Sequence, residues 1–291
     1  MRIIALSGGL GNQMFQYAFF LTLKKRYRYV FFSTRKIHKR KEHNGYELNR
    51  LFGVQSFFSE ILLNIPMLGW ILYYVLFPQK YKEGKCYFFS GNSDVFDAKY
   101  WSSRYIGYWQ SEKFFKDAEE DVRNIFKFNK EKLNKQTRDF LDVIKRTPYS
   151  VSLHVRRGDY VSPLGEDGPP SIFGNVCTDY YYTEARRRIL ERFPHAVFFI
   201  FSDDTNWCKV HFPSDANIVN WNTGKDSWQD MFLMSCCRHH ITANSSFSWW
   251  GAYLGQHDDT VTITPRKWMN NKDTPDIAPD SWIKIDSQFT K

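Results

Sequence analysis

Cysteine is scarce in this sequence and forms no pattern that a disulfide framework needs. The five cysteines contain no C-x-x-C pair, and their odd number leaves at least one unpaired. Residues 1–6, Met-Arg-Ile-Ile-Ala-Leu, run directly into glycines and predict a first strand instead of a secretory leader. We therefore expect free thiols in a reducing compartment, which excludes a disulfide-stabilised secreted domain.

Long hydrophobic runs are also missing. The most apolar segment, residues 61–79, carries no charge but is interrupted by asparagine, proline and glycine. A helix that crosses a bilayer needs about 20 apolar residues. We expect a buried or half-buried helix here, with peripheral contact to anionic lipid as the alternative. Such contact would be favoured by Lys80, Lys82, Lys85 and the basic run 35–41.

Acidic residues are in the minority. The chain has 31 Asp and Glu against 40 Lys and Arg, a formal net charge of +9 and a pI near 9.2. This balance favours anionic partners such as nucleotides, nucleic acids or acidic lipids. The basic residues are scattered and no nucleic-acid-binding motif is present, so we expect no nucleic-acid partner.

The usual signatures of metal and triphosphate sites are absent too. There is no Asp-x-Asp pair, since Asp94 and Asp97 are too far apart, and no His/Cys/Asp cluster has the spacing of metal ligands. No Gly-Lys-Ser/Thr is present, which excludes a P-loop. We expect a site without metal or other cofactor, in which the protein itself supplies the positive charge.

The elements that are present predict an α/β protein of two domains. Short apolar runs alternate with helix-prone segments, most clearly after residue 149, as in βαβ units with parallel sheets. Strands are expected at 2–6, 30–33, 151–155, 197–201, 217–221, 240–243 and 260–264, and helices at 13–26, 180–193, 206–211, 227–237 and 247–254. Thr147-Pro148 marks the expected boundary between domains 1–148 and 149–291, with a C-terminal segment that can return to the first domain.

The glycine turn after the first strand has the position of a dinucleotide fingerprint but lacks two of its parts. From Gly9 it reads G-x-G-x-x-M, because Met14 stands where the third glycine belongs, and no acidic residue ends the second strand. What distinguishes the turn is Gly11-Asn12-Gln13. Its two amides at a helix start could hold hydroxyls or a leaving group.

Residues 154–160, His-Val-Arg-Arg-Gly-Asp-Tyr, are the most informative segment of the chain. They follow an alternating strand that places His154 and Arg156 on one side, with Arg157 and Asp159 in the turn beyond. Guanidinium groups match phosphate oxygens bidentately, which predicts a doubly anionic ligand. A surface network of arginine and aspartate is the alternative.

Two further polar turns follow later strands. Asn244, Ser245 and Ser246 begin an apolar helix, where free N–H groups and the helix dipole attract an anion; an ordinary helix cap is the alternative. Asp203 and Asp204 follow the apolar strand 197–201 and could accept hydrogen bonds from a base or ribose, or cap the next helix. Ligands of parallel sheets lie beyond the carboxyl ends of the strands, so we expect these turns to share one crevice with Arg156.

Taken together, these segments resemble the alpha-1,2-fucosyltransferases of glycosyltransferase family 11. The resemblance is carried by residues 9–18 (GLGNQMFQYA), 154–160 (HVRRGDY) and 244–250 (NSSFSWW), with support from 107–115 and 201–204. It implies the GT-B fold, with two Rossmann-like domains facing a central cleft. It also implies an inverting, metal-independent transfer of fucose from GDP-fucose, which the C-terminal domain binds while the N-terminal domain takes the acceptor.

The resemblance also implies roles for single residues. Arg156 would bind the β-phosphate and carry catalysis, His154 would lie near the guanosine, and Asn12 would lie close to the reacting centre. Asp203 or Asp204 would read guanine. The remaining expected donor contacts are Gly9, Gly11, Gln13, Arg157, Asn244, Ser245, Ser246 and Phe247. Asp159 is the candidate general base, with Glu166 and Asp167 behind it, although a structural Asp159 that fixes the arginines remains open.

The acceptor implied by the resemblance is the 2-hydroxyl of a terminal galactose in an oligosaccharide. We expect a bacterial enzyme of O-antigen or capsule assembly, cytoplasmic or peripheral on the inner membrane, acting on a lipid-linked glycan. The alternatives are another linkage, another GDP-sugar, or a non-catalytic module that binds a nucleotide or glycan.

Overall fold

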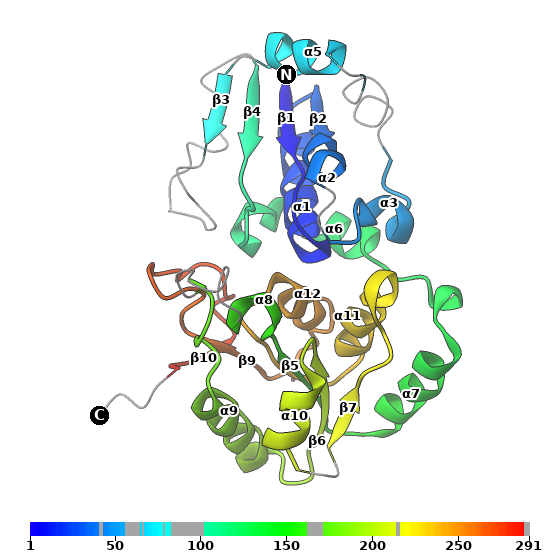
Figure 1. The fold of residues 1–291 in the computed structure, drawn as a ribbon, viewed down its shortest axis with the longest axis vertical. Helices are drawn as coiled ribbons and strands as arrows, with labels where there is room; N and C mark the ends of the chain where they lie inside the picture. Colours follow the sequence, from blue (N-terminus) through cyan, green and yellow to red (C-terminus); the bar gives the residue numbers. More distant parts are fainter. Residues whose placement is uncertain are drawn as a thin grey trace. The chain divides into compact units, whose positions relative to one another are not determined.

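The chain divides into two compact units in the computed structural model, Met1–Asn129 and Lys130–Lys291 (Figure 1). The structure describes residues 1–40, 43–55, 65, 67–77, 79–82, 102–161, 171–213 and 216–287. The cysteines Cys177, Cys208, Cys236 and Cys237 are free, and Cys86 lies outside the described residues. Each unit is built on its own parallel sheet, which confirms the α/β prediction.

The first unit holds a four-stranded parallel sheet in the order β2-β1-β4-β3. Its strands are β1 (Arg2–Ala5), β2 (Val30–Ser33), β3 (Gln79–Lys82) and β4 (Ser103–Ile106). The chain places β2 on one side of β1 and β4 on the other. The strand order therefore reverses between β1 and β4, which makes the carboxyl ends of these two strands a topological switch point.

The helices of the first unit are α1 (Leu10–Arg26), α2 (Arg35–Arg40), α3 (Glu47–Phe52), α5 (Leu68–Leu76) and α6 (Glu119–Ile125). Short 3-10 turns occupy Glu112–Phe114 and Lys116–Ala118. Helix α1 is buried over most of its length, and aromatic contacts such as the Phe19–Trp109 stack, 4.4 Å between centroids, hold it in the core. The lysines and arginine of its last turn complement the negative end of the helix dipole.

Helix α5 is half-buried, in agreement with the first of the two expectations for this segment. Tyr73 and Phe77 pack against Ile3 of β1, while Met67, Leu68, Ile71, Tyr74 and Val75 stay exposed. Residues 61–64, 66 and 78 of the apolar segment lie outside the described part of the chain. Within the described ranges, no helix combines the length and the hydrophobicity that crossing a bilayer requires.

The second unit holds a six-stranded parallel sheet in the order β10-β9-β8-β5-β6-β7. Its strands are β5 (Ser150–Val155), β6 (Val197–Ser202), β7 (Asn217–Val219), β8 (His239–Ile241), β9 (Thr262–Pro265) and β10 (Ile283–Ile285). Read from β7, this is the Rossmann order 3-2-1-4-5-6, with its switch point between β5 and β8. The strand β10 keeps the end of the chain in the second sheet.

Helices cover this sheet in the alternation that the sequence predicts. They are α7 (Lys135–Arg146), α8 (Gly158–Val161), α9 (Asp179–Arg192), α10 (Thr205–His211), α11 (Trp228–Ser235) and α12 (Ser246–Leu254), with 3-10 turns at Lys130–Lys132 and Gly224–Asp226. The expected strands and helices are present, with ends that differ by a few residues. The short strands β3, β4 and β10 were not expected.

The boundary between the units differs from the expected position at Pro148. Helix α7 belongs to the second unit, because the Phe140 ring lies 5.5 Å from Phe199 and 5.0 Å from Trp221, between centroids. The backbone N–H of Asn134 also donates to Gln229 Oε1 at 2.9 Å. The proline therefore marks the turn from α7 into β5, and the division falls at Asn129.

Replacing Gly251 by alanine tests the close packing of α11 on α12. A Cβ atom at Gly251 would lie 2.9 Å from Met234 Cβ, a distance that requires the two helices to shift. We expect Gly251→Ala to lower the free energy of unfolding by about 1–3 kcal/mol, as overpacking does, measured by urea denaturation. An unchanged transition midpoint would show that α11 and α12 do not approach this closely.

Candidate functional site

The switch point of the second sheet brings the expected donor-site residues of this unit to one edge. In the parallel register, His154 of β5 lies beside Phe201 of β6, so the turn after β5 adjoins the turn that carries Asp203 and Asp204. On the other side β5 pairs with β8, which leads to Asn244 and the start of α12. The prediction that these turns lie side by side is confirmed.

Arg156 is held between two carboxylates. Its Nη2 lies 2.6 Å from Asp159 Oδ1 and its Nη1 lies 2.8 Å from Asp203 Oδ2. The guanidinium also lies 5.4 Å from the centroid of the Tyr160 ring. About a third of the side chain stays exposed, 30%. The arginine–aspartate network therefore exists, and it fixes a cation that solvent still reaches.

Arg157 and Asp204 form the adjacent half of this network. The Nε of Arg157 lies 3.1 Å from Asp204 Oδ2, and its guanidinium lies 4.6 Å from the Trp207 ring centroid. Asp204 caps α10 by accepting from the Trp207 N–H at 3.0 Å. That hydrogen bond, with help from Arg157, holds the pKa of the Asp204 carboxyl below its usual range.

Asp203 is tied to the turn after β5 by its other oxygen. The backbone N–H of Arg157 donates to Asp203 Oδ1 at 2.9 Å. A Cβ atom at Gly158 would lie 2.6 Å from Asp203 Oδ2, so a larger residue there would displace this oxygen from its place beside Arg156. Both acidic residues expected to read a base thus already have structural partners in the protein.

The start of α12 is capped and anchored. The Ser245 hydroxyl accepts from the Phe247 N–H at 3.3 Å, which confirms the cap, and Ser246 begins the helix. Asn244 is buried: its Nδ2 donates to the carbonyl oxygens of Phe173 and Trp268, both at 2.9 Å. Asn244 therefore holds the turn in place, whereas Ser246 and Phe247 are only half-buried.

His154 is buried at the end of β5, where its Nδ1 has no hydrogen-bond partner among the described residues. Its ring lies 5.9 Å from the Phe247 ring, between centroids. Burial, reinforced by the charge of Arg156, lowers the pKa of His154 to about 3. The imidazole is therefore neutral at physiological pH and adds no charge beside the arginines.

In the first unit, the glycine turn leads from β1 into α1, with Gly9 at the N-cap and Gly11 in the first turn. Gln13 is fully buried: its Nε2 donates to the Gly8 and Gly45 carbonyls at 2.9 and 2.8 Å, and its Oε1 accepts from the Glu47 N–H at 3.0 Å. Both the nitrogen and the oxygen of this amide are thus hydrogen-bonded to backbone groups. Gln13 fixes the following loop and offers no free group to a ligand, in contrast to the expectation.

Asn12 differs from Gln13 because it is only half-buried. Its Oδ1 accepts from Gln110 Nε2 at 2.7 Å. A Cβ atom at Gly8, whose φ is +77°, would lie 2.7 Å from Asn12 Nδ2, so the glycine makes room for this amide. Asn12 and Gln110 therefore meet at the switch point between β1 and β4.

Sequence reasoning missed Asp230, His43 and the side chain of Gln110. Burial raises the pKa of the Asp230 carboxyl to about 7, and its Oδ1 accepts from Asn222 Nδ2 at 2.7 Å. The exposed His43 lies with its ring against Gly9. Asp230 and His43 stand in no motif, so only the fold could reveal them, whereas Gln110 lies in the segment 107–115 that supports the family resemblance. Glu166 and Asp167, proposed behind Asp159, lie outside the described residues.

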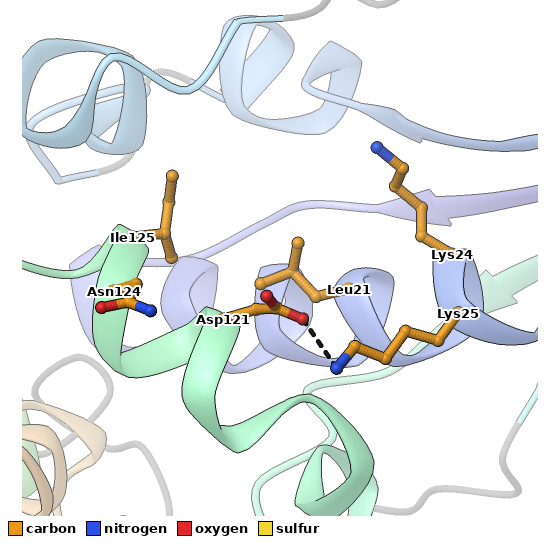
Figure 2. A pocket seen from close by; sticks show the side chains of 6 residues that line it. All are labelled: Leu21, Lys24, Lys25, Asp121, Asn124 and Ile125. Atoms are coloured by element: carbon orange, nitrogen blue, oxygen red, sulfur yellow. Dashed lines mark ion pairs between the residues drawn. The ribbon is translucent and has the colours of Figure 1, made fainter.

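A shallow hollow of about 540 Å³ lies elsewhere on the first unit, between α1 and α6 (Figure 2). Its lining residues are Leu21, Lys24, Lys25, Asp121, Asn124 and Ile125. Its Lys25–Asp121 ion pair, 2.8 Å long, joins two half-exposed side chains, and such pairs contribute little. Across the described ranges, no three His, Cys, Asp or Glu side chains are arranged to hold a metal ion.

The two Rossmann-like units place the chain in the GT-B class of α/β folds. The crystal structure of POFUT1 in complex with GDP-fucose has this fold, with a TM-score of 0.51, 12% identity and coverage of 90% of this chain and 96% of that chain. At this identity the likeness concerns the fold alone.

Sequence comparisons identify the family. The model of glycosyl transferase family 11 matches residues 1–286. An alpha-1,2-colitosyltransferase of Escherichia coli is 34% identical over 98% of both chains. The O-antigen biosynthesis glycosyltransferase WbnK of E. coli is 29% identical over 96% of this chain and 99% of its own length. The chain belongs to glycosyltransferase family 11, and the predicted family is confirmed.

The neutral state of His154 predicts how stability depends on pH. The native residue resists protonation down to about pH 3, whereas the unfolded chain takes up this proton near its ordinary pKa of 6.5. The unfolded state therefore binds more protons between these values, and the free energy of unfolding falls as the pH falls from about 6.5. Between pH 7 and 5.5, this residue contributes a loss of about 1 kcal/mol.

The substitution His154→Gln isolates this contribution. Urea denaturation of both proteins at pH 7 and 5.5 should show a smaller loss in the variant, by about 1 kcal/mol. Equal losses would mean that His154 is protonated as readily in the native protein as in the unfolded chain.

Proposed function

We propose that this enzyme transfers L-fucose from GDP-fucose to the 2-hydroxyl of a terminal galactose, with inversion at the anomeric carbon. One observation carries the proposal: Arg156, fixed by Asp159 and Asp203, lies at the switch point of a Rossmann sheet beside the strand that leads into α12. This is where such sheets bind nucleotides, and it combines a guanidinium with a helix N-terminus.

The proposed chemistry follows the movement of charge. As the bond between C1 of fucose and the phosphate oxygen breaks, its electron pair passes to the β-phosphate and the sugar becomes oxocarbenium-like. Arg156 and the N–H groups at the start of α12 would stabilise the growing negative charge more than the ground state. Both are fixed before the reaction, so little reorganisation is needed.

The nucleoside would extend along the same edge of the sheet. The half-buried Phe247 ring, which lies 5.9 Å from the buried and neutral His154 ring, offers an aromatic surface beside the phosphate site. Recognition of guanine by Asp203 or Asp204 has to coexist with their pairing to Arg156 and Arg157.

Inversion needs a group that takes the proton of the attacking hydroxyl. Asp159 stays our candidate, because its side chain is 65% exposed and Arg156 contacts its Oδ1, which leaves Oδ2 open to solvent. The same contact suits a purely structural Asp159 that orients Arg156. The substitution Asp159→Asn distinguishes the two roles. An asparagine amide still accepts a hydrogen bond from Arg156 but takes no proton, so activity is retained only if the role is structural.

A second donor is favoured by a specific observation. The relative that is 34% identical is named an alpha-1,2-colitosyltransferase, and colitose is fucose without its 3-hydroxyl. GDP-colitose is therefore the alternative donor. The name of the second relative favours a role in O-antigen synthesis, for which the acceptor would be a lipid-linked glycan. The exposed apolar face of α5 would suit peripheral contact with a membrane that carries such a glycan.

Removing the Arg156 guanidinium tests its catalytic role. We expect Arg156→Ala to lower kcat by about 10²–10³, the usual effect of losing one charge-stabilising donor. Arg156→Lys should recover only part of this loss, because an ammonium lacks the bidentate fork. The matched control is Arg187→Ala on the exposed side of α9, which should turn over normally. A folded Arg156→Ala enzyme with normal kcat would refute the assignment.

The donor and the need for metal are tested by one assay. GDP release from GDP-fucose and from GDP-colitose is measured in EDTA, with and without lactose as a β-galactoside. We expect release that depends on lactose and survives chelation, with fucose preferred, and a 1,2 linkage in the product. Preference for GDP-colitose would establish the alternative donor, and release that stops in EDTA would contradict a metal-free site.

A further inference from the structure

The switch point of the first unit contains a second built polar site, separate from the arginines. Helix α1 presents three residues on one face, at positions i, i+4 and i+7, to the turn that follows β4. Asn12 accepts from Gln110 Nε2 at 2.7 Å, Gln16 Nε2 donates to the Gly107 carbonyl at 3.0 Å, and Phe19 stacks on Trp109. The turn is thus tied to α1 at three successive levels.

This turn is held in an unfavourable conformation. Trp109 has a φ of +56°, a region that bulky side chains rarely adopt, and its indole Nε1 is buried without a hydrogen-bond partner among the described residues. A Cβ atom at Gly107 would lie 3.1 Å from the Trp109 ring. Strain of this kind persists where the surrounding structure imposes it, and it is common at binding sites.

The strained turn positions an amide pair whose hydrogen bonding is incomplete. Gln110 is only 5% exposed, and its Oε1 has no partner among the described residues. Its Nε2 donates to Asn12 Oδ1, so the half-buried Asn12 keeps Nδ2 as the donor that this bond does not use. By contrast Gln16, on the same helix face, is bonded at both ends of its amide. An unsatisfied amide next to a half-exposed one indicates a place for a polar ligand.

The chemistry of the pair identifies the ligand class. Both side chains are neutral, and the first turn of α1 carries no charged residue, so the pair suits a neutral polyol better than a phosphate. A sugar hydroxyl can accept a hydrogen bond from Asn12 Nδ2, the group of the pair that the bond between Gln110 and Asn12 does not use. Ligands of parallel sheets bind at switch points, and this is the switch point of the first sheet.

We infer that Asn12 and Gln110 form a hydroxyl-binding subsite for the acceptor glycan, in which Gln110 is the positioning residue that turns Asn12 Nδ2 toward the sugar. The inference rests on the proposed function, which assigns the nucleotide sugar to the second unit and leaves the acceptor to the first. Without Gln110, the Asn12 amide would rotate freely and present its oxygen as often as its nitrogen.

A double-mutant cycle tests the subsite. Asn12→Ala, Gln110→Met and the double variant are compared in kcat and in KM for lactose and for GDP-fucose. We expect Gln110→Met to raise the lactose KM about tenfold, the effect of losing one hydrogen bond, with the KM for GDP-fucose unchanged. Asn12→Ala should have at least this effect, and the double variant should equal Asn12→Ala, because Gln110 acts through Asn12.

Controls separate this role from simple instability. Gln136→Met replaces an exposed glutamine of α7 and should change neither KM. Thermal unfolding and GDP binding confirm that each variant is folded. Gln110→Glu, which keeps the size but cannot donate to Asn12 Oδ1, should reproduce the lactose effect of Gln110→Met. An unchanged lactose KM in Gln110→Met, a raised GDP-fucose KM, or effects that add in the double variant would each overturn the inference.

An error in the proposed function can be told apart from an error in the proposed subsite. If the wild-type enzyme releases no GDP from GDP-fucose with lactose, the proposed reaction is wrong, and lactose binding is then measured directly by saturation-transfer NMR. Binding to the wild type that is lost in Asn12→Ala and Gln110→Met would support the subsite on its own. Absent binding, or binding that survives both substitutions, would overturn it.

Discussion

The parallel pairing of β5 with both β6 and β8 is the constraint on which the candidate donor site depends. Parallel strands all end at the same edge, so three segments distant in sequence deliver their polar turns to one place. One turn carries the paired arginines, one the two aspartates, and one the start of α12. Between β5 and β8 the connections diverge, and ligands of such sheets bind beyond the strand ends at this point. In the first unit, the parallel strands β1 and β4 likewise bring the turns that follow them to one edge of the sheet.

The charges around the switch point between β5 and β8 decide which ligand this site can bind. Two arginines stand among three carboxylates, and each guanidinium has a protein partner and an aromatic neighbour. Arg156 keeps one geometry without a ligand, because its planar guanidinium is bonded through both Nη1 and Nη2. Arg157 is held through its Nε and by the Trp207 ring. A phosphate that approaches Arg156 meets a cation already oriented, next to a helix N-terminus and a histidine that stays neutral. Such preorganisation is the main source of charge stabilisation in enzymes.

Much of this arrangement could be predicted from the sequence, since alternation and turn residues are local signals. The strands at 151–155, 197–201 and 240–243 were expected within a few residues of their observed ends, and with them the meeting of Arg156, Asp203 and Ser245 at one edge. The cap at Ser245 follows from its position before an apolar helix.

The features that sequence analysis missed depend on tertiary contacts. Gln13 looks like a free amide at a helix start, yet the loop through Gly45 and Glu47 buries it. Helix α7 precedes a proline, which suggests a boundary, but the side chain of Phe140 packs it onto the second sheet. Asp230 stands on a helix, and only the packing around it raises its pKa. Short strands such as β10 carry too few residues for a periodic signal.

The central claim is that Arg156 and the start of α12 hold the diphosphate of a GDP-sugar, and a crystal structure of the enzyme with GDP tests it most directly. The account predicts a β-phosphate oxygen within hydrogen-bond distance of the Arg156 guanidinium, with backbone N–H groups of the first turn of α12 on its other side. It also predicts that the contact between Asp203 and the Arg157 N–H is retained. A diphosphate bound elsewhere, with Arg156 paired only to Asp159 and Asp203, would contradict it.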